Sequence, residues 1–176
     1  LIYSIGIKMK KTTLTIICVL SACFFINSAI ATEPKSIGKY KSWESFSYTN
    51  EKGKVCFAQT IPIERTPKKI KRDESRLFVT FRKEEKIKNE ISVTSGHLYK
   101  KSSVVAISGK NDFSFFSQGK FAWISDGEEE FNLIKVMKKA SKLSIASSDL
   151  NGNKTKDLYS MMGFTKAYNT AKKSCA

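Results

Sequence analysis

The sequence has few of the residues on which metal and redox sites depend. It holds one histidine, His97, three prolines among 176 residues and no C-x-x-C pair. A zinc site ordinarily needs three or four protein ligands, and a thioredoxin-like centre needs the C-x-x-C pair. His97 stands in SGHLYKK without a neighbouring cluster of Cys, Asp or Glu. No metal, cofactor or catalytic residue is therefore assigned, and we expect a protein that is not an enzyme.

Two further candidate sites, a serine nucleophile and a calcium loop, also lack residues that their chemistry requires. No G-x-S-x-G motif is present, so no serine can be paired with His97 from spacing alone. The segment Asp149–Asp157 is acidic, but the calcium-loop pattern needs glycine at its sixth position and glutamate at its twelfth. Lys154 and Ser160 stand there instead. The segment is better explained as a polar hairpin turn at Asn151-Gly152.

Acidic residues are scarce relative to basic ones. The chain has 31 Lys and Arg against 16 Asp and Glu, a net charge of +15, of which +12 belongs to residues 32–176. Such an excess favours anionic partners, namely lipid, lipopolysaccharide, glycan or nucleic acid. The alternative, which the composition leaves open, is a lysine-rich surface that only keeps the protein soluble.

The first part of the chain has the pattern of a secretory signal. Residues 1–8 precede the first methionine and indicate an over-extended start. Residues 9–31 place Lys10 and Lys11 before an apolar run that ends in a small-x-small site, which predicts cleavage between Ala31 and Thr32. We expect residues 32–176 to be a single exported domain in the periplasm or at the outer membrane. Nucleic acid is then excluded as a partner. A lipoprotein box ending in Cys23 is the minor alternative.

Only two of the four cysteines lie in the exported domain. Cys56 and Cys175 remain after processing, and two cysteines in an oxidising compartment usually form a bridge. Closing a loop of this length stabilises the fold by about 4–5 kcal/mol in the chain-entropy account. Two free buried thiols are the alternative.

Short β-rich runs recur at about ten-residue spacing, which predicts a β-sandwich or barrel. Two segments with apolar residues three and four apart, 128–140 and 164–175, predict helices that cover the core. The expected fold is mainly β, with about nine strands and two short helices, one at the C-terminus. The expected strands are 40–48, 55–61, 77–83, 90–94, 104–108, 113–117, 121–125, 142–147 and 156–162.

The densest basic stretch is RTPKKIKRDESR, residues 65–76. It predicts a contact patch for an anionic surface. A long solvated loop explains the same residues, since charged runs of this kind are usually exposed. The residues of the predicted patch are Arg65, Lys68, Lys69, Lys71 and Arg72.

Several motifs in order resemble the invasion-associated locus B family of exported proteins from Gram-negative bacteria. They are YKSWESF, KVCFAQTIP, LFVTFR, NEISVTSG, FAWIS, LIKVMKKA and DLYSMMGFTKAY before Cys175. The resemblance runs from about Tyr40 to Cys175. It implies an immunoglobulin-like β-sandwich in the cell envelope and, in some pathogens, an association with host-cell entry. It implies no enzymatic activity. The chain departs from the family after Gly96, at His97-Leu98.

The resulting hypothesis is an exported, non-catalytic envelope protein that binds a macromolecular or anionic surface partner. The alternative is a periplasmic enzyme or enzyme regulator that acts on envelope polymers. An enzyme should show a pocket with converging titratable groups, whereas a binding protein should show a basic or apolar surface patch. No transmembrane span is expected in residues 32–176, and the sequence does not determine the oligomeric state.

Overall fold

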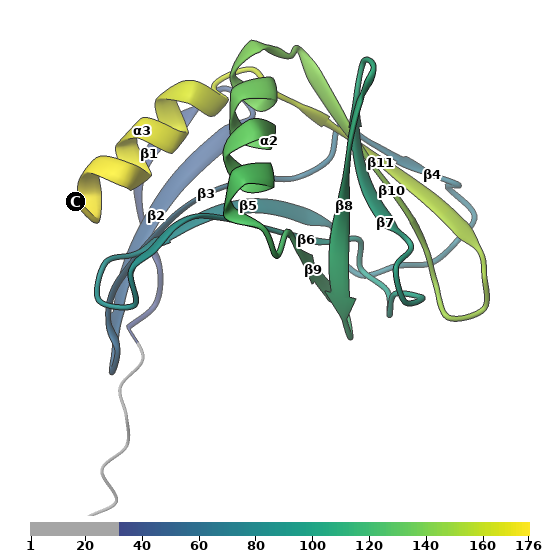
Figure 1. The fold of residues 1–176 in the computed structure, drawn as a ribbon, viewed down its shortest axis with the longest axis horizontal. Coiled ribbons are helices and arrows are strands. Elements are labelled where there is room, and N and C mark those ends of the chain that lie inside the picture. The colour runs from purple at the N-terminus through teal and green to yellow at the C-terminus, as the bar shows by residue number, and fades with distance from the viewer. Residues whose placement is uncertain (1–31) are drawn as a thin grey trace, which may run out of the picture. The chain divides into compact units, whose positions relative to one another are not determined.

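A computed structural model describes residues 32–176, which form eleven strands and two helices (Figure 1). Residues 1–8, the predicted signal peptide over 9–31 and the lipoprotein alternative at Cys23 lie outside the described residues. The helices are α2 (Gly127–Lys139) and α3 (Phe164–Ser174). The strands are β1 (Lys35–Tyr40), β2 (Trp43–Asn50), β3 (Gly53–Thr60), β4 (Glu64–Thr66), β5 (Arg76–Arg82), β6 (Ile87–Thr94), β7 (Val104–Ser108), β8 (Asn111–Gln118), β9 (Phe121–Trp123), β10 (Lys142–Ser148) and β11 (Lys154–Ser160).

All strand pairs are antiparallel, and the strands follow one another in the order β1-β2-β3-β5-β6-β9-β8-β7-β10-β11-β4. Strand β8 joins two parts of this sheet. Its first half, from Asn111 to Phe115, pairs with β7, and its second half, from Phe116 to Gln118, pairs with β9. The continuous sheet therefore turns over at β8 into a sandwich-like arrangement.

One core lies between the two parts of the sheet. Side chains alternate along each strand, so that Leu77 and Val79 of β5 are fully buried while Phe78 between them is only half-buried. Leu143 and Ile145 of β10 join the same core from the other side. Trp43 of β2 is also fully buried, and its indole N–H donates to the Ser160 carbonyl at 2.9 Å. Burial and a hydrogen bond thus fix the first strands against β11.

Helix α2 begins where the sequence supplies a cap. The Asp126 carboxylate accepts hydrogen bonds from the amides of Glu128 and Glu129, both at 2.9 Å. Acidic residues fill the first turn and Lys138 and Lys139 the last, in agreement with the helix dipole. The buried face of α2 consists of Leu133, Ile134 and Met137.

Helix α3 packs across β1, β2, β3 and β5 (Figure 1). Gly163 precedes it with φ +95°, and a Cβ there would lie 1.8 Å from the Tyr40 carbonyl oxygen. Only glycine permits this backbone angle together with this close approach. Gly163 therefore allows the β1–β2 turn to pack directly on the start of α3.

The Cys56–Cys175 bridge predicted from the sequence is present, with an S–S distance of 2.02 Å and a Cα–Cα distance of 5.8 Å. It joins the centre of β3 to the residue that follows α3. Lys54 supports the same junction, since its ammonium donates to the Ser174 carbonyl at 2.7 Å. The end of α3 is thus tied to β3 by a covalent bond and a hydrogen bond.

The expected mainly β, sandwich-like fold with two helices, one of them C-terminal, is confirmed. The structure has eleven strands rather than about nine. The two additional strands are β4 and β1; the strand expected over residues 40–48 corresponds to β2 and includes only the last residue of β1. Neither helix of residues 32–176 has the length and apolarity that a membrane crossing requires.

Candidate functional site

The basic segment of the predicted patch runs from β4 to the start of β5. Lys68, Lys69 and Lys71 are exposed on the connecting loop, as a surface patch requires. None of these three lysines forms an ion pair within residues 32–176. The two arginines of the predicted patch are placed differently.

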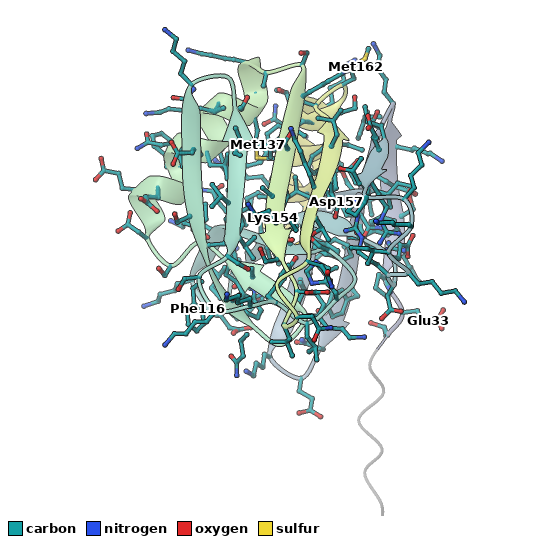
Figure 2. The ribbon with its side chains drawn as sticks, turned by 90° about the vertical axis from the view of Figure 1, so that its right-hand side faces the viewer. Glu33, Phe116, Met137, Lys154, Asp157 and Met162 are labelled. Atoms are coloured by element: carbon teal, nitrogen blue, oxygen red, sulfur yellow. A yellow bond between two sulfur atoms is a disulfide. The ribbon has the colours of Figure 1, made fainter. Side chains whose placement is uncertain are left out.

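Arg72 points into the molecule. Its guanidinium donates to both carboxylate oxygens of Asp157, at 2.7 and 3.0 Å, and to the Ser95 carbonyl at 3.0 Å. Figure 2 labels Asp157 on β11. The side chains of Arg72 and Asp157 are 1% and 0% exposed. Such a two-pronged pair fixes geometry as well as charge. Arg72 therefore does not belong to the surface patch, which corrects its assignment from the sequence.

Arg65 is partly committed to the same pair. Its Nε lies 4.0 Å from Asp157, its side chain is 34% exposed, and its guanidinium donates to the Asp73 carbonyl. Arg65 and Arg72 thus supply two positive charges around one buried carboxylate. The outward charge of the predicted patch rests on the three lysines.

Further contacts hold the loop in place. The Asp73 amide donates to the Gly96 carbonyl at 2.9 Å, and Lys120 pairs with the Asp73 carboxylate at 2.6 Å. The hydrogen bond and charge of Lys120 lower the pKa of Asp73 below its usual value. Gly96 has φ +74°, and a Cβ on it would clash with the Asp73 backbone at 2.1 Å. The loop is exposed, but it is anchored on the sheet.

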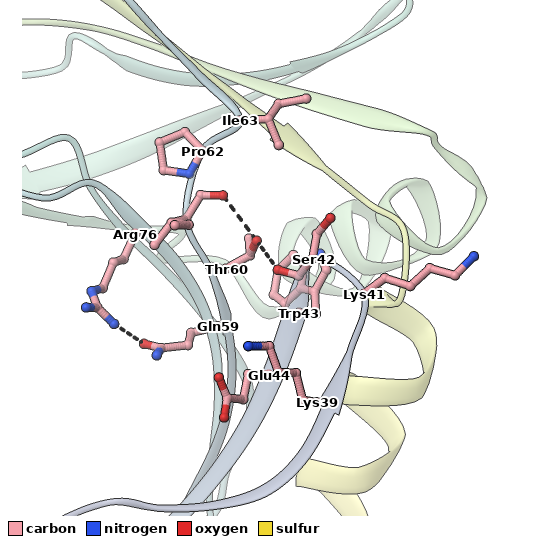
Figure 3. A pocket seen from close by; sticks show the side chains of 11 residues that line it. Lys39, Lys41, Ser42, Trp43, Glu44, Gln59, Thr60, Pro62, Ile63 and Arg76 are labelled. Carbon is pink, nitrogen blue, oxygen red and sulfur yellow. Dashed lines mark hydrogen bonds between the residues drawn. The ribbon is translucent and has the colours of Figure 1, made fainter.

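A pocket of about 430 Å³ lies between the β1–β2 turn and the end of β3, and Arg76 of β5 also lines it (Figure 3). Fully buried Trp43 lies at its base. The hydroxyl of Thr60 donates to the Ser42 carbonyl at 2.6 Å, and Arg76 donates to the Gln59 side chain at 3.0 Å. These bonds fix the polar wall of the pocket.

Charged and aliphatic side chains meet at this pocket. Lys39 and Lys41 line it and form no ion pair within the described part of the chain, whereas Arg76 is paired with Glu74. Glu44 also lines the pocket, and its carboxylate accepts from the Ser36 hydroxyl at 2.6 Å. Ile61 and Ile63 line the same pocket and are 54% and 55% exposed. Met162 is also 54% exposed, and its carbonyl accepts from the Ser42 amide. We call the surface formed by Lys39, Lys41, Ile61, Ile63 and Met162 the amphiphilic end.

Lys41 occupies the turn in an unusual backbone conformation. Tyr40 pairs with Trp43, so Lys41 and Ser42 are the two residues of a tight hairpin turn. Lys41 has φ 55°, in the left-handed region that glycine and asparagine normally fill. This conformation costs a lysine roughly 1 kcal/mol relative to an ordinary backbone angle. The turn therefore holds a positive charge at its tip at some expense in stability.

His97 takes part in a polar cluster. Its Nε2 lies 3.0 Å from the Thr155 hydroxyl and 3.4 Å from the Ser147 hydroxyl, and these hydroxyls lie 2.7 Å apart. Ser147 and Thr155 are each 4% exposed. The cluster continues through the Ser95 hydroxyl, which lies 3.5 Å from that of Ser147 and accepts from the Tyr99 hydroxyl at 2.9 Å. Burial raises the pKa of Tyr99 to about 12. A buried Ser147 hydroxyl already bonded to Thr155 is suited to joining β10 and β11 rather than to attacking a substrate.

The aromatic residues divide between the core and the outer face of the sheet. Trp43 and Phe115 are buried, whereas Phe116 and Phe121 are 58% and 44% exposed. Phe121 and Trp123 stack with ring centroids 6.1 Å apart. Together with aromatics of β2, β3 and β5 they border an open groove of about 440 Å³. The sequence pattern did not distinguish these outward aromatics from core residues.

No group of three or more His, Cys, Asp or Glu side chains within residues 32–176 is arranged to hold a metal ion. The hairpin turn expected at Asn151-Gly152 is present, and the Asp149 carboxylate accepts from the amides of Asn151 and Asn153. The former calcium candidate is thus a hydrogen-bonded turn.

No family model matches the chain, and neither a curated protein nor a solved structure matches it.

Proposed function

We propose that residues 32–176 form an exported, non-catalytic envelope protein that binds an anionic surface through the amphiphilic end. The observation that carries the proposal is the position of Lys39 and Lys41, which form no ion pair within residues 32–176, beside the exposed side chains of Ile61 and Ile63. Export is supported by the signal pattern over residues 9–31 and is compatible with the Cys56–Cys175 bridge.

A lipid or lipopolysaccharide surface matches both kinds of side chain. Each lysine close to an anionic membrane contributes about 1 kcal/mol of attraction. Exposed aliphatic side chains next to these lysines gain further free energy by leaving water at the boundary between headgroups and acyl chains. The lysines of the loop, Lys68, Lys69 and Lys71, add to the attraction without contributing apolar contact.

The resemblance to the invasion-associated locus B family supports a place in the cell envelope. The motifs that carry it, from YKSWESF to DLYSMMGFTKAY, span the described fold from β1 to α3. A role in host-cell entry rests on that resemblance alone. The surface that we propose as the binding site is independent of it, because it follows from the side chains of this chain.

Binding to vesicles of phosphatidylcholine with and without phosphatidylglycerol tests the proposal. The double variant Lys39→Ser/Lys41→Ser should bind the anionic vesicles about thirtyfold less tightly than the parent. Lys101→Ser/Lys110→Ser is the matched control, because these exposed lysines border none of the pockets described and their loss changes the net charge equally. Equal losses in both variants would show that only the total charge matters and would refute the amphiphilic end.

The loop is tested separately. Lys68→Ser/Lys69→Ser/Lys71→Ser removes the outward charge of the predicted patch and leaves the buried Arg72 in place. Each of these surface changes should alter the free energy of unfolding by less than about 0.5 kcal/mol. If the loop contributes to binding, this variant loses affinity for anionic vesicles at low salt. Unchanged affinity would leave the loop as a solvated connection.

A further inference from the structure

Four lysines line a second pocket, at the opposite end of β5 from the amphiphilic end. Arg76, the first residue of β5, borders the first pocket, whereas Phe81 near the end of β5 borders the second. The β5–β6 hairpin and the last turn of α3 form its walls. The pocket has a volume of about 480 Å³, and its lysines are Lys83, Lys86, Lys88 and Lys172. We call it the lysine pocket.

No acidic side chain lines the lysine pocket. The two glutamates of the hairpin turn lie outside this lining: Glu85 pairs with Arg82 at 3.4 Å, and the exposed Glu84 side chain lies beside Gly53. None of the four lysines forms an ion pair within residues 32–176. Four positive charges are thus gathered in one concavity whose lining holds no acidic side chain, and the one negative group among the lining residues is the α-carboxylate of Ala176.

The neighbourhood adds further positive charge. Lys138 of α2 lies 4.2 Å from the centre of the Tyr168 ring, and Lys172 lies 6.0 Å from the same ring. Burial and the nearby charge of Lys172 lower the pKa of Lys138. Like charges so close together repel one another, which lowers the stability of the free protein. A bound anion would remove this repulsion.

The walls of the lysine pocket are fixed in advance. The Tyr168 hydroxyl of α3 donates to the Asn89 side chain of the hairpin at 2.5 Å. The Cys56–Cys175 bridge holds the last turn of α3 on β3, and Cys175 itself lines the pocket. Groups held by packing and hydrogen bonds lose little further freedom when a ligand binds.

The backbone of the hairpin also favours a binding role. Lys86 has φ 57°, a left-handed conformation that glycine adopts without cost. The amide of Lys86 donates to the Lys83 carbonyl at 3.0 Å and closes the turn. A lysine in this conformation costs roughly 1 kcal/mol. Residues held in unfavourable conformations concentrate at functional sites.

We propose that the lysine pocket binds a compact anion that carries phosphate groups, either a phosphorylated small molecule or the phosphorylated headgroup of a lipid. Four ammonium groups match the several negative charges of a phosphomonoester or diphosphate, for which lysine is a common ligand. The volume falls within the range of small-molecule sites. Phe81, 5% exposed, and Ile87 supply an apolar side to the pocket. This site is separate from the amphiphilic end and goes beyond the proposed function.

Calorimetric titration with inorganic pyrophosphate is the first test. The parent should bind saturably, and Lys83→Ser/Lys86→Ser/Lys88→Ser/Lys172→Ser should bind at least about tenfold more weakly. The matched control is Lys101→Ser/Lys110→Ser/Lys142→Ser/Lys154→Ser, which removes the same charge from exposed positions that line neither pocket. In the parent, pyrophosphate should shift the amide signals of residues 83–89 and 172–175 and leave those of 39–44 unchanged.

Vesicles that contain phosphatidic acid distinguish the two sources of the anion. Loss of vesicle binding in the lysine-pocket variant without saturable pyrophosphate binding assigns the site to a lipid headgroup. The reverse result assigns it to a free solute. The proposal fails if neither probe depends on the four lysines, or if the control variant loses as much affinity as the lysine-pocket variant.

Lys86→Gly provides a variant that cannot be dismissed as misfolded. Glycine relieves the left-handed backbone, so the variant should unfold at the same or a higher temperature than the parent. It should nevertheless bind pyrophosphate several-fold more weakly. Unchanged affinity in this variant would contradict the part of the proposal that assigns Lys86 to the site.

Discussion

At the scale of single residues, Arg72 and Asp157 have the greatest consequence for stability. Among the ion pairs of residues 32–176, only this pair has both side chains at 1% exposure or less. Asp157→Asn would leave the guanidinium buried without its counter-charge, so we expect a loss of about 3–5 kcal/mol in the free energy of unfolding. Urea denaturation measures it.

Two comparisons make this prediction specific. Lys71→Ser, one residue from Arg72 but exposed, should change the free energy of unfolding by less than about 0.5 kcal/mol. The double replacement Arg72→Met/Asp157→Leu removes both charges together and should cost less than Asp157→Asn alone. If Asp157→Asn were as stable as the parent, water would have to reach the pair, which would contradict the prediction.

Glu130 makes stability depend on pH. Burial, and then the charges of Glu90 and Asp126, raise its pKa from 4.5 to about 7, against the hydrogen bond that its carboxylate accepts from the Ile91 amide. Between these two values the folded state holds a proton that the unfolded state has lost. The contribution of Glu130 is therefore complete below pH 4.5 and is lost as the pH rises through about 7.

Unfolding of the parent and of Glu130→Gln at pH 5 and pH 8 tests this prediction. The parent should lose stability between the two values, whereas Glu130→Gln, which does not titrate, should lose less. Glu130→Gln should also be the more stable of the two at pH 8. The same pH dependence in both proteins would assign the effect to other groups.

At the scale of elements, most strands and both helices could be predicted from the sequence because their patterns are local. Strand β5 alternates from Leu77 to Phe81, and α2 carries its cap and its terminal charges within fourteen residues. The turn between β1 and β2 could not be predicted, since Lys41-Ser42 lacks the glycine or asparagine that usually marks such a turn. Lys41 adopts the left-handed conformation that glycine or asparagine usually adopts in such a turn.

The orientation of side chains on loops could not be predicted from the sequence for a different reason. Arg72 belongs to a basic run that is typical of a surface, but its partner Asp157 lies 85 residues away on β11. The lysine pocket likewise combines the β5–β6 hairpin with the end of α3. Contacts between distant segments depend on how the sheet closes, and no local pattern specifies this.

The Cys56–Cys175 bridge belongs to the same scale, because it holds α3 against β3. Cys56→Ala/Cys175→Ala should lower the free energy of unfolding by about 2–5 kcal/mol. Urea denaturation of the parent and the variant gives the difference. In the denatured, unreduced parent, a thiol-specific alkylating agent should modify neither cysteine; modification of both would contradict the bridge.

At the scale of the whole molecule, charge and apolar surface make separable contributions to the proposed binding. Residues 32–176 carry a net charge of +12, and Ile61 and Ile63 are exposed next to Lys39 and Lys41. Attraction between exposed charges is screened beyond about 8 Å at physiological ionic strength. The contribution of the two isoleucines does not depend on this screening.

The affinity for anionic vesicles should therefore fall steeply with added sodium chloride and then level off at a residual value. Ile61→Ser/Ile63→Ser should keep the steep part and lose the residual binding at high salt. Lys39→Ser/Lys41→Ser should show the opposite pattern, with a shallower salt dependence and most of the residual binding retained. Vesicle sedimentation over a series of salt concentrations measures the salt-dependent affinity and the residual affinity at high salt for each protein. If the two variants show the same salt dependence, the charged and aliphatic side chains do not act as two parts of one surface, and binding would follow from net charge alone.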